Sequence, residues 1–257
     1  TTGGKLPLTV NGKLKPGNYE IDGNISSQFI TGLLYALPLL EGDSKLIINK
    51  NLESKGYVDL TLEILKLAGI EIVNNDYKSF DIRGNQTYKP FDYTVEGDYS
   101  QVAFWIVAGI ISANRDNEVK CFHVNKNSLQ GDREIIEIVT RMGAKLEIFD
   151  DYVIVKPSKT KGTVIDISQC PDIGPVLTVL AALSEGETRI INGERLRIKE
   201  SDRITSIKTE LNKLGGNVSE EGDSLIIQGV EGFRGGVTVN AWNDHRIAMS
   251  LAVASTR

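Results

Sequence analysis

Cysteine and histidine are both scarce in this sequence, with two residues of each among 257. Cys121 and Cys170 are too few and too far apart for a disulfide framework or a thiolate metal site. We expect them to be small buried residues in a reducing compartment. His123 and His245 are likewise too few for a histidine metal centre, so no bound metal is expected.

Long apolar runs are also lacking. The longest, 29–40 and 102–111, are interrupted by glycine or proline and are shorter than a bilayer-spanning helix. No signal peptide is visible, and no glycine run has the spacing of a phosphate-binding loop. A net charge of −5 argues against general nucleic-acid binding. These absences predict a cytoplasmic protein that binds neither membranes nor nucleic acid.

The composition that remains, 40% apolar and 25% charged, is typical of a soluble globular protein of one or two domains. Its most informative feature is self-similarity. Three amphipathic helical segments each end at a glycine, and these glycines, Gly69, Gly143 and Gly215, lie 74 and 72 residues apart. Glycine adopts the left-handed conformation after a helix without a Cβ clash, so each is predicted to end its helix.

A second landmark recurs in step with these glycines and opens an apolar helical stretch each time. Its occurrences, separated by 73, 72 and 72 residues, are Ser27-Gln28, Ser100-Gln101, Asp172-Ile173 and Asp244-His245. The chain is therefore predicted to hold three copies of one unit and the start of a fourth.

The third copy defines the unit most clearly through its hydrophobic periodicity. Its predicted elements are a strand (163–167), a helix (173–183), a strand (187–191), a helix (202–214) and a closing hairpin (217–220 with 224–228). The predicted unit is β-α-β-α-β-β, which places the protein in the α/β (α+β) class.

The fourth copy reaches Arg257 after one predicted strand and one helix. A unit that cannot bury its own apolar face is an unusual place for a chain to end, so we expect truncation there. Residues 87–91 are the best candidate for a domain crossing. We predict a domain at 1–91 with about one repeat, and a domain at 92–257 with two full repeats and the start of a third.

The unusual polar residues fall at two equivalent places in the repeat. At the start of the first helix stand Ser26-Ser27-Gln28, Asp172 and Asn243-Asp244-His245-Arg246. Before the second helix, 15 and 12 positions ahead of the terminating glycine, stand Ser54 and Tyr57 in the first copy, Ser128 and Gly131 in the second, and Glu200 and Arg203 in the third.

Both places are helix N-termini, where unpaired N–H groups and the helix dipole favour a bound anion. Lys199, Arg203 and Arg246 add positive charge, and the planar arginine fork suits a carboxylate or a phosphate. If the repeats pack with pseudo-symmetry, these helix starts together predict a site for a ligand with several anionic groups.

Simpler interpretations exist for single residues. Capping alone accounts for any one of the good N-cap residues, Ser27, Asp172, Asp202 and Asp244. The run 199–203 is compatible with a solvated charged turn, and His245 with a structural histidine. Three adjacent polar side chains at 26–28 exceed what one cap needs, however, and 199–203 lies in the slot of Ser54 and Tyr57. The binding interpretation is therefore favoured.

Together these motifs resemble the 5-enolpyruvylshikimate-3-phosphate synthases, also called 3-phosphoshikimate 1-carboxyvinyltransferases. The resemblance runs the whole length and rests above all on the Ser-Ser-Gln run at 26–28, Lys-Glu-Ser-Asp-Arg at 199–203 and Asn-Asp-His-Arg at 243–246. It implies a two-domain, inverted α/β barrel built from β-α-β-α-β-β units. It also implies transfer of the enolpyruvyl group of phosphoenolpyruvate to the 5-hydroxyl of shikimate 3-phosphate, releasing phosphate, on the pathway to chorismate and aromatic amino acids.

The resemblance assigns roles to individual residues. Shikimate 3-phosphate would contact Ser26, Ser27, Gln28, Ser54, Tyr57, Asp172 and Lys199, with the serines of 26–28 on its phosphate. Phosphoenolpyruvate would contact Gln28, Arg203 and Arg246. Asp172 would take the proton of the attacking hydroxyl, and Glu200 would exchange a proton with the methylene carbon. No metal or organic cofactor is implied, and the full-length protein is expected to be a monomer.

The sequence departs from the family pattern in two respects. The family's N-terminal Lys-Ser pair, arginines and glycine-rich loop are not found, and a C-terminal lysine would lie beyond Arg257, which implies truncation at both ends. Arg195 stands where some members carry a substrate-binding asparagine, so that role is not transferred.

Two alternatives remain. The sibling enolpyruvyl transferase that acts on UDP-N-acetylglucosamine has a similar fold and the same donor, but the runs at 26–28 and 199–203 favour shikimate 3-phosphate. A non-catalytic anion-binding fragment is the other alternative, and the intact Asp172 and Glu200 argue against loss of the chemistry.

Overall fold

The computed structural model describes residues 7–257 and contains two compact units. One comprises the chain up to Glu53 together with Val58–Asp92, and the other comprises Ser54–Tyr57 and Tyr93–Arg257. The first six residues of the predicted domain 1–91 lie outside the described range. No helix within 7–257 is both long enough and apolar enough to cross a membrane.

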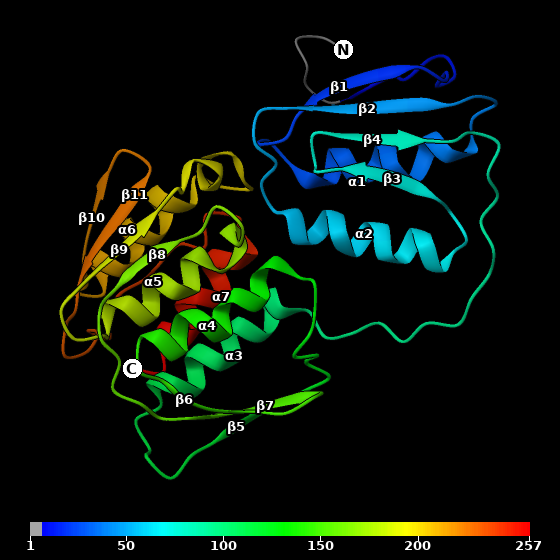
Figure 1. Ribbon diagram of the computed structural model, residues 1–257. Coiled ribbons are helices and arrows are strands. Elements are labelled where there is room, and N and C mark those ends of the chain that lie inside the picture. Colours follow the sequence, from blue (N-terminus) through cyan, green and yellow to red (C-terminus); the bar gives the residue numbers. More distant parts are fainter. Residues whose placement is uncertain (1–6) are drawn as a thin grey trace. The chain divides into compact units, whose positions relative to one another are not determined.

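The first unit follows the order β-α-β-α-β-β (Figure 1). Its elements are β1 (Asn18–Asp22), α1 (Ser27–Ala36), a 3-10 turn η1 (Leu37–Leu39), β2 (Ser44–Asn49), α2 (Lys55–Leu67), β3 (Ile72–Asn75) and β4 (Ser79–Ile82). The sheet order is β1-β2-β4-β3, with β1 parallel to β2 and the other pairs antiparallel. The apolar faces of the helices, including Ile30, Leu34 and Leu65, are buried in one core with Leu46 and Phe80 of the sheet.

The second unit holds the remaining elements. They are α3 (Tyr99–Ile111), β5 (Val119–Phe122), η2 (Gly131–Arg133), α4 (Glu134–Arg141), β6 (Lys145–Ile148), β7 (Tyr152–Lys156), β8 (Val164–Asp166), η3 (Pro171–Ile173), α5 (Gly174–Ala182), β9 (Glu187–Ile191), η4 (Glu194–Ile198), α6 (Arg203–Lys213), β10 (Asn217–Glu221), β11 (Ser224–Gln228) and α7 (His245–Ala254). They form a four-stranded sheet, β10-β11-β9-β8, and a three-stranded sheet, β5-β7-β6.

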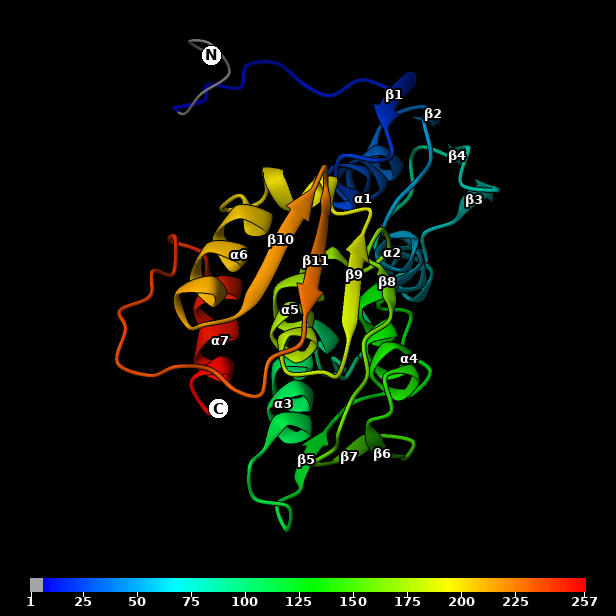
Figure 2. The same ribbon diagram turned by 90° about the vertical axis from the view of Figure 1, so that its left-hand side faces the viewer.

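Three helices, α3, α5 and α7, pack against one another in the core of the second unit (Figures 1 and 2). Each is the first helix of its repeat copy. Every residue of α5 is buried, as expected of a helix without a polar face. The four-stranded sheet packs on α5 and α6, and α3 packs on β5 and β7. The α/β fold class predicted from the repeats is confirmed.

The third copy contains all six predicted elements, with strand β9 at its predicted bounds and helix α6 one residue shorter at each end. Gly69, Gly143 and Gly215, predicted to end the second helices, have left-handed φ values of 78°, 97° and 87°. The helix-ending role of these glycines is confirmed.

The prediction of a first strand was wrong for two of the copies. Neither the second nor the fourth copy forms its first strand among the described residues. In the first and third copies that strand pairs in parallel with the second strand. Residues 93–97 make one such backbone bond, from the N–H of Gly97 to the carbonyl of His123 (2.7 Å). Residues 237–240 pair with no strand within the described part of the chain. A strand requires backbone groups that pair with another strand, so an alternating apolar pattern in the sequence is not enough to form one.

Candidate functional site

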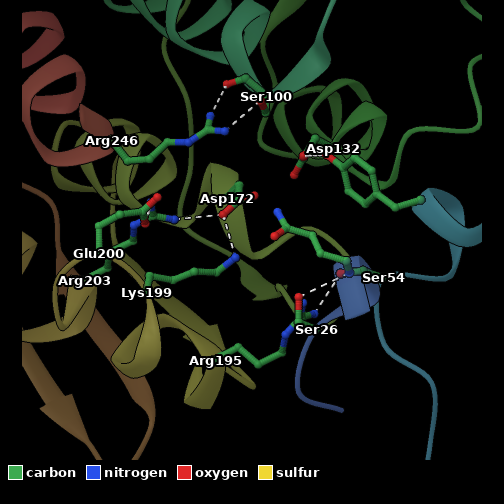
Figure 3. A network of polar contacts seen from close by, with 12 residues as sticks. Ser26, Ser54, Ser100, Asp132, Asp172, Arg195, Lys199, Glu200, Arg203 and Arg246 are labelled. Carbon is green, nitrogen blue, oxygen red and sulfur yellow. Dashed lines mark hydrogen bonds and ion pairs between the residues drawn. The ribbon is translucent and has the colours of Figure 1, made fainter. Parts of the chain in front are cut away.

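The first helices of three repeat copies begin close together in the second unit. Segment η3, which leads into α5, contacts η2, η4 and α3. The start of α7 reaches α3 through Arg246, whose Nη1 and Nη2 donate to the carbonyl and Oγ of Ser100 at 2.9 and 2.8 Å. The pseudo-symmetric packing expected from the repeats therefore brings several helix N-termini into one region (Figure 3).

Capping accounts for some of the polar residues at these N-termini. Asp202 caps α6 through the N–H of Thr205 (3.1 Å), and Asp244 caps α7 through the N–H of Arg246 (2.8 Å). The cap interpretation of those two residues is confirmed.

The cap interpretation was wrong for Ser27 and Asp172. Ser26 is the residue that caps α1, accepting from the N–H of Gln28 at 3.3 Å, and Ser27 is the first helical residue. Asp172 lies inside η3 and makes no cap bond, because its carboxylate faces cations instead. Its side chain therefore needs an explanation other than the helix end.

Arg203 is the centre of the polar network in the second unit. Its side chain is 1% exposed and donates to three carboxylates. Nη1 lies 2.8 Å from Oδ1 of Asp172, Nη2 lies 2.7 Å from Oε2 of Glu200, and Nε lies 2.8 Å from Oδ2 of Asp244. One guanidinium thus holds the two predicted catalytic carboxylates on its two terminal nitrogens (Figure 3).

Asp172 is also paired with Lys199, whose Nζ lies 3.1 Å from the Oδ1 atom that Arg203 contacts. Burial by itself raises the pKa of this carboxyl, but the positive charges of Lys199, Arg246 and Arg203 outweigh it and hold the pKa below its usual value. The carboxylate is therefore ionised at neutral pH and able to accept a proton.

Asp244 is fully buried and supports both arginines. Besides Arg203 and the backbone N–H of Arg246, it accepts a hydrogen bond from Oγ of Ser201 at 3.0 Å. Burial alone raises its pKa, but the bonds from Arg203 and the Arg246 backbone lower it below the usual value. A buried anion satisfied in this way holds the Arg203 guanidinium in place and caps the helix that carries Arg246.

Two hydroxyl groups lie at the start of α2. Ser54 precedes the helix with a left-handed φ of 54°, and its Oγ accepts from Nη1 of the buried Arg195 at 2.7 Å. Tyr57, in the first turn, donates its phenol proton to Oδ2 of Asp132. Both residues belong to the second unit, as do their partners Arg195 and Asp132.

The structure thus brings together Ser54, Tyr57, Asp172, Lys199, Glu200, Arg203 and Arg246 in the second unit. The other predicted site residues, Ser26, Ser27 and Gln28, belong to the first unit, where they begin α1. Ser27 is buried and Gln28 is exposed, so the hydroxyl-rich helix start offers Gln28 to a ligand more readily than Ser27.

Three further residues contact the predicted site residues but were not themselves predicted to be part of the site: Ser100, Asp132 and Arg195. A signal existed for the first two. Ser100 is the second-copy counterpart of Ser27, and Asp132 directly follows Gly131, the second-copy counterpart of Tyr57. Arg195 stands at a position where some family members carry a substrate-binding asparagine, but its contact with Ser54, which spans 141 positions of the chain, was not predicted.

Within residues 7–257, no cluster of three or more histidine, cysteine, aspartate or glutamate side chains is arranged to hold a metal ion. His245 is half exposed, and its Nδ1 lies 3.8 Å from Oδ1 of Asp244.

A family model described as EPSP synthase (3-phosphoshikimate 1-carboxyvinyltransferase) matches residues 1–257. The chain belongs to the EPSP synthase family. Among curated relatives, the 3-phosphoshikimate 1-carboxyvinyltransferase of Clostridium novyi is 55% identical over the whole chain and 58% of its own length. That of Clostridium kluyveri is 54% identical over the whole chain and 59% of its own length. The chain thus spans a little under three fifths of these EPSP synthase family relatives.

The fold of the EPSP synthase family is also found by structural comparison. A solved EPSP synthase from Acinetobacter baumannii superimposes with a TM-score of 0.78 at 26% identity, covering 95% of this chain and 57% of that one. A second structure of EPSP synthase from the same organism gives a TM-score of 0.76 at 25% identity. The resemblance to this family inferred from the motifs is confirmed.

Proposed function

We propose that this chain supplies a large part of the active site for transfer of the enolpyruvyl group of phosphoenolpyruvate to the 5-hydroxyl of shikimate 3-phosphate. The observation that carries the proposal is the shared attachment of Asp172 and Glu200 to Arg203, beside Lys199. Two carboxylates held close together among cations match a reaction that adds an alcohol across an anionic enol ether. That addition needs a base at the oxygen and an acid at the carbon.

Lys199, Ser54 and Tyr57 would bind shikimate 3-phosphate, together with Ser26, Ser27 and Gln28 of the first unit. Arg246 and Arg203 would hold the carboxylate of phosphoenolpyruvate, with Gln28 contacting both substrates. The relatives are named 3-phosphoshikimate 1-carboxyvinyltransferase, which supports shikimate 3-phosphate as the acceptor. We further propose that residues 1–91 and 92–257 belong to the two domains of such an enzyme.

Asp172 would remove the proton of the attacking 5-hydroxyl as its oxygen bonds to C2 of phosphoenolpyruvate. The low pKa of the Asp172 carboxyl depends on nearby cations. An anionic substrate beside Lys199 would offset that charge and raise the pKa, making the carboxylate a stronger base once the substrate is bound.

Glu200 would deliver a proton to the methylene carbon and recover it when phosphate leaves and the enol ether reforms. Its side chain is 51% exposed, whereas the partner Arg203 is buried. Of the three carboxylates on Arg203, Glu200 is therefore the one that an incoming substrate carboxylate displaces with the smallest loss. Binding of phosphoenolpyruvate would release Glu200 toward the methylene carbon, while the buried pair with Asp244 stays intact.

The test is kinetic and uses a protein of the relatives' length that contains this chain, here called the full-length protein. Phosphate release from phosphoenolpyruvate should require shikimate 3-phosphate, and Asp172→Asn and Glu200→Gln should each lower turnover by roughly 10²- to 10⁴-fold while binding of shikimate 3-phosphate weakens far less. Near-normal turnover in both variants contradicts the assignment. Activity with UDP-N-acetylglucosamine in place of shikimate 3-phosphate would identify the sibling reaction instead.

The 257-residue chain alone is expected to bind shikimate 3-phosphate weakly and not to release phosphate from phosphoenolpyruvate. Anion binding at solvent-exposed helix ends is favoured by only about 0.3–1 kcal/mol per end. Calorimetry with shikimate 3-phosphate and a phosphate-release assay on the same material separate binding from catalysis. Binding without release in the full-length protein as well would indicate a non-catalytic anion-binding protein.

A further inference from the structure

The two hydroxyls at the start of α2 have chemically opposite partners. Ser54 accepts from Arg195, and a guanidinium can only donate, so the proton of the Ser54 hydroxyl is left to donate to another acceptor. Tyr57 donates its one phenol proton to Asp132. While Asp132 is ionised, Tyr57 therefore presents a lone pair, not a proton, to an anionic ligand. The two hydroxyls cannot both donate to a phosphate in this state.

Asp132 is poorly satisfied as an anion. Its side chain is 0% exposed, and among the described residues Oδ1 has no hydrogen-bond partner. Burial raises the pKa of this carboxyl to about 7, although the Tyr57 hydrogen bond opposes the shift. A buried carboxylate with one hydrogen bond is less stable than its protonated form would be, so it readily takes up a proton.

The charged groups that act on Asp132 come from several elements. The carboxylates of Asp172 on η3 and Asp98 before α3 raise its pKa, and Arg246 on α7 lowers it. Arg133 and Glu134 are its neighbours along the chain, and the thiol of Cys170 precedes η3. Two negative groups and one positive group thus surround the carboxyl, and they favour the protonated form on balance.

Close backbone packing fixes Tyr57 beside Asp132. A Cβ at Gly56 would lie 2.2 Å from the carbonyl of Leu129 and 2.9 Å from the nitrogen of Gly131. A Cβ at Gly131 would lie 2.4 Å from the carbonyl of Gln169. The backbones on either side of the pair touch without room for a methyl group, which holds the phenol within reach of the carboxyl.

We propose that Asp132 is a positioning residue that takes up one proton from solvent when a phosphate group binds at Tyr57. The protonated Oδ2 then donates to the phenol oxygen, and the phenol donates its own proton to the phosphate. One proton enters with the ligand, and no other bond forms or breaks. This inference rests on the proposed function, because it takes shikimate 3-phosphate as the ligand at Tyr57.

The coupling between proton uptake by Asp132 and phosphate binding at Tyr57 can be measured. With a pKa of about 7, Asp132 is already protonated in acid and must gain a proton in alkali before Tyr57 can donate. The affinity for shikimate 3-phosphate should therefore fall roughly tenfold between pH 7 and pH 8.5, a range in which the phosphate is already largely dianionic. Close to one proton should be taken up per ligand at pH 8.

Asp132→Asn is the decisive variant. An amide N–H can donate to the phenol without a proton from solvent, so the variant should bind shikimate 3-phosphate with little dependence on pH and without the extra proton uptake. Tyr57→Phe is the second variant, which removes the phenol and should also abolish the uptake. Asp59→Asn is the matched control, because Asp59 accepts from Tyr77 at 2.7 Å in a tyrosine–aspartate pair that includes no residue of the proposed site.

The experiment is calorimetry of the full-length protein with shikimate 3-phosphate, in buffers of different ionisation enthalpy between pH 7 and 8.5. Proton uptake in the wild type and in Asp59→Asn, but in neither Asp132→Asn nor Tyr57→Phe, supports the inference. Equal uptake in the wild type and Asp132→Asn overturns it, as does uptake retained in Tyr57→Phe. Absence of binding in the wild type refutes the proposed function, and the inference falls with it, whereas binding without uptake refutes the inference alone.

Discussion

Replacement of Arg203 by methionine tests whether the carboxylate network around this side chain stabilises the folded second unit. The side chains of Arg203 and Asp244 are 1% and 0% exposed and lie 2.8 Å apart, so the substitution leaves a buried carboxylate without its cation. Breaking a buried pair in this way costs about 3–5 kcal/mol of unfolding free energy. The more exposed partners, Asp172 and Glu200, add at most about 1 kcal/mol each.

Urea unfolding of the 257-residue chain measures this cost. Both tryptophans of the sequence, Trp105 and Trp242, belong to the second unit, so their fluorescence follows that unit alone. The double variant Arg203→Met/Asp244→Asn removes the orphaned charge and should be more stable than the sum of the two single changes predicts, by up to about 3 kcal/mol.

Arg189→Met is the matched control, because Arg189 is about half exposed and pairs with Glu187 on the same strand, β9. Loss of that exposed pair should cost about 1 kcal/mol or less. If Arg203→Met costs no more than Arg189→Met, the buried pair does not stabilise the unit and the reasoning from burial is refuted.

Two further predictions concern the same network. In the full-length protein, Arg246→Ala should raise the requirement for phosphoenolpyruvate roughly 10- to 150-fold, the equivalent of about 1.5–3 kcal/mol for a charged hydrogen bond, and Ser27→Ala should mainly raise the requirement for shikimate 3-phosphate. Steady-state kinetics with each substrate varied decide this, and an Arg246 variant that affects only shikimate 3-phosphate contradicts it. Because the folded pKa of Asp244 is depressed, its stabilisation is complete above the unfolded pKa of about 3.9 and is lost as the pH falls below that value. Acid unfolding followed by fluorescence should therefore be less steep for Asp244→Asn, and an unchanged slope would show that Asp244 does not carry this linkage.

Local signals in the sequence determined most of the secondary structure and the identity of the family. The left-handed glycines at 69, 143 and 215 ended their helices as expected, because φ at a helix C-terminus depends mainly on the residue itself. Helix α6 formed where its apolar spacing predicted, because residues three and four apart lie on one face of a helix. The sequence alone also showed the resemblance to the EPSP synthase family, through the runs at 26–28, 199–203 and 243–246.

Features that depend on a partner distant in the sequence were decided by tertiary structure alone. Residues 93–97 and 237–240 alternate like strands, yet neither forms one, because a strand exists only where another backbone pairs with it. Aspartate is a common N-cap residue, and Asp172 was predicted to cap a helix. Its carboxylate instead contacts Lys199 and Arg203, which lie 27 and 31 positions away.

The pairing of Tyr57 with Asp132 across 75 positions, and of Ser54 with Arg195 across 141, follows the same rule. The sequence by itself determined which residue types stand at the helix starts. Only the packing of the repeats decided which of them touch, because hydrogen bonds and desolvation act over a few ångströms in space whatever the separation along the chain.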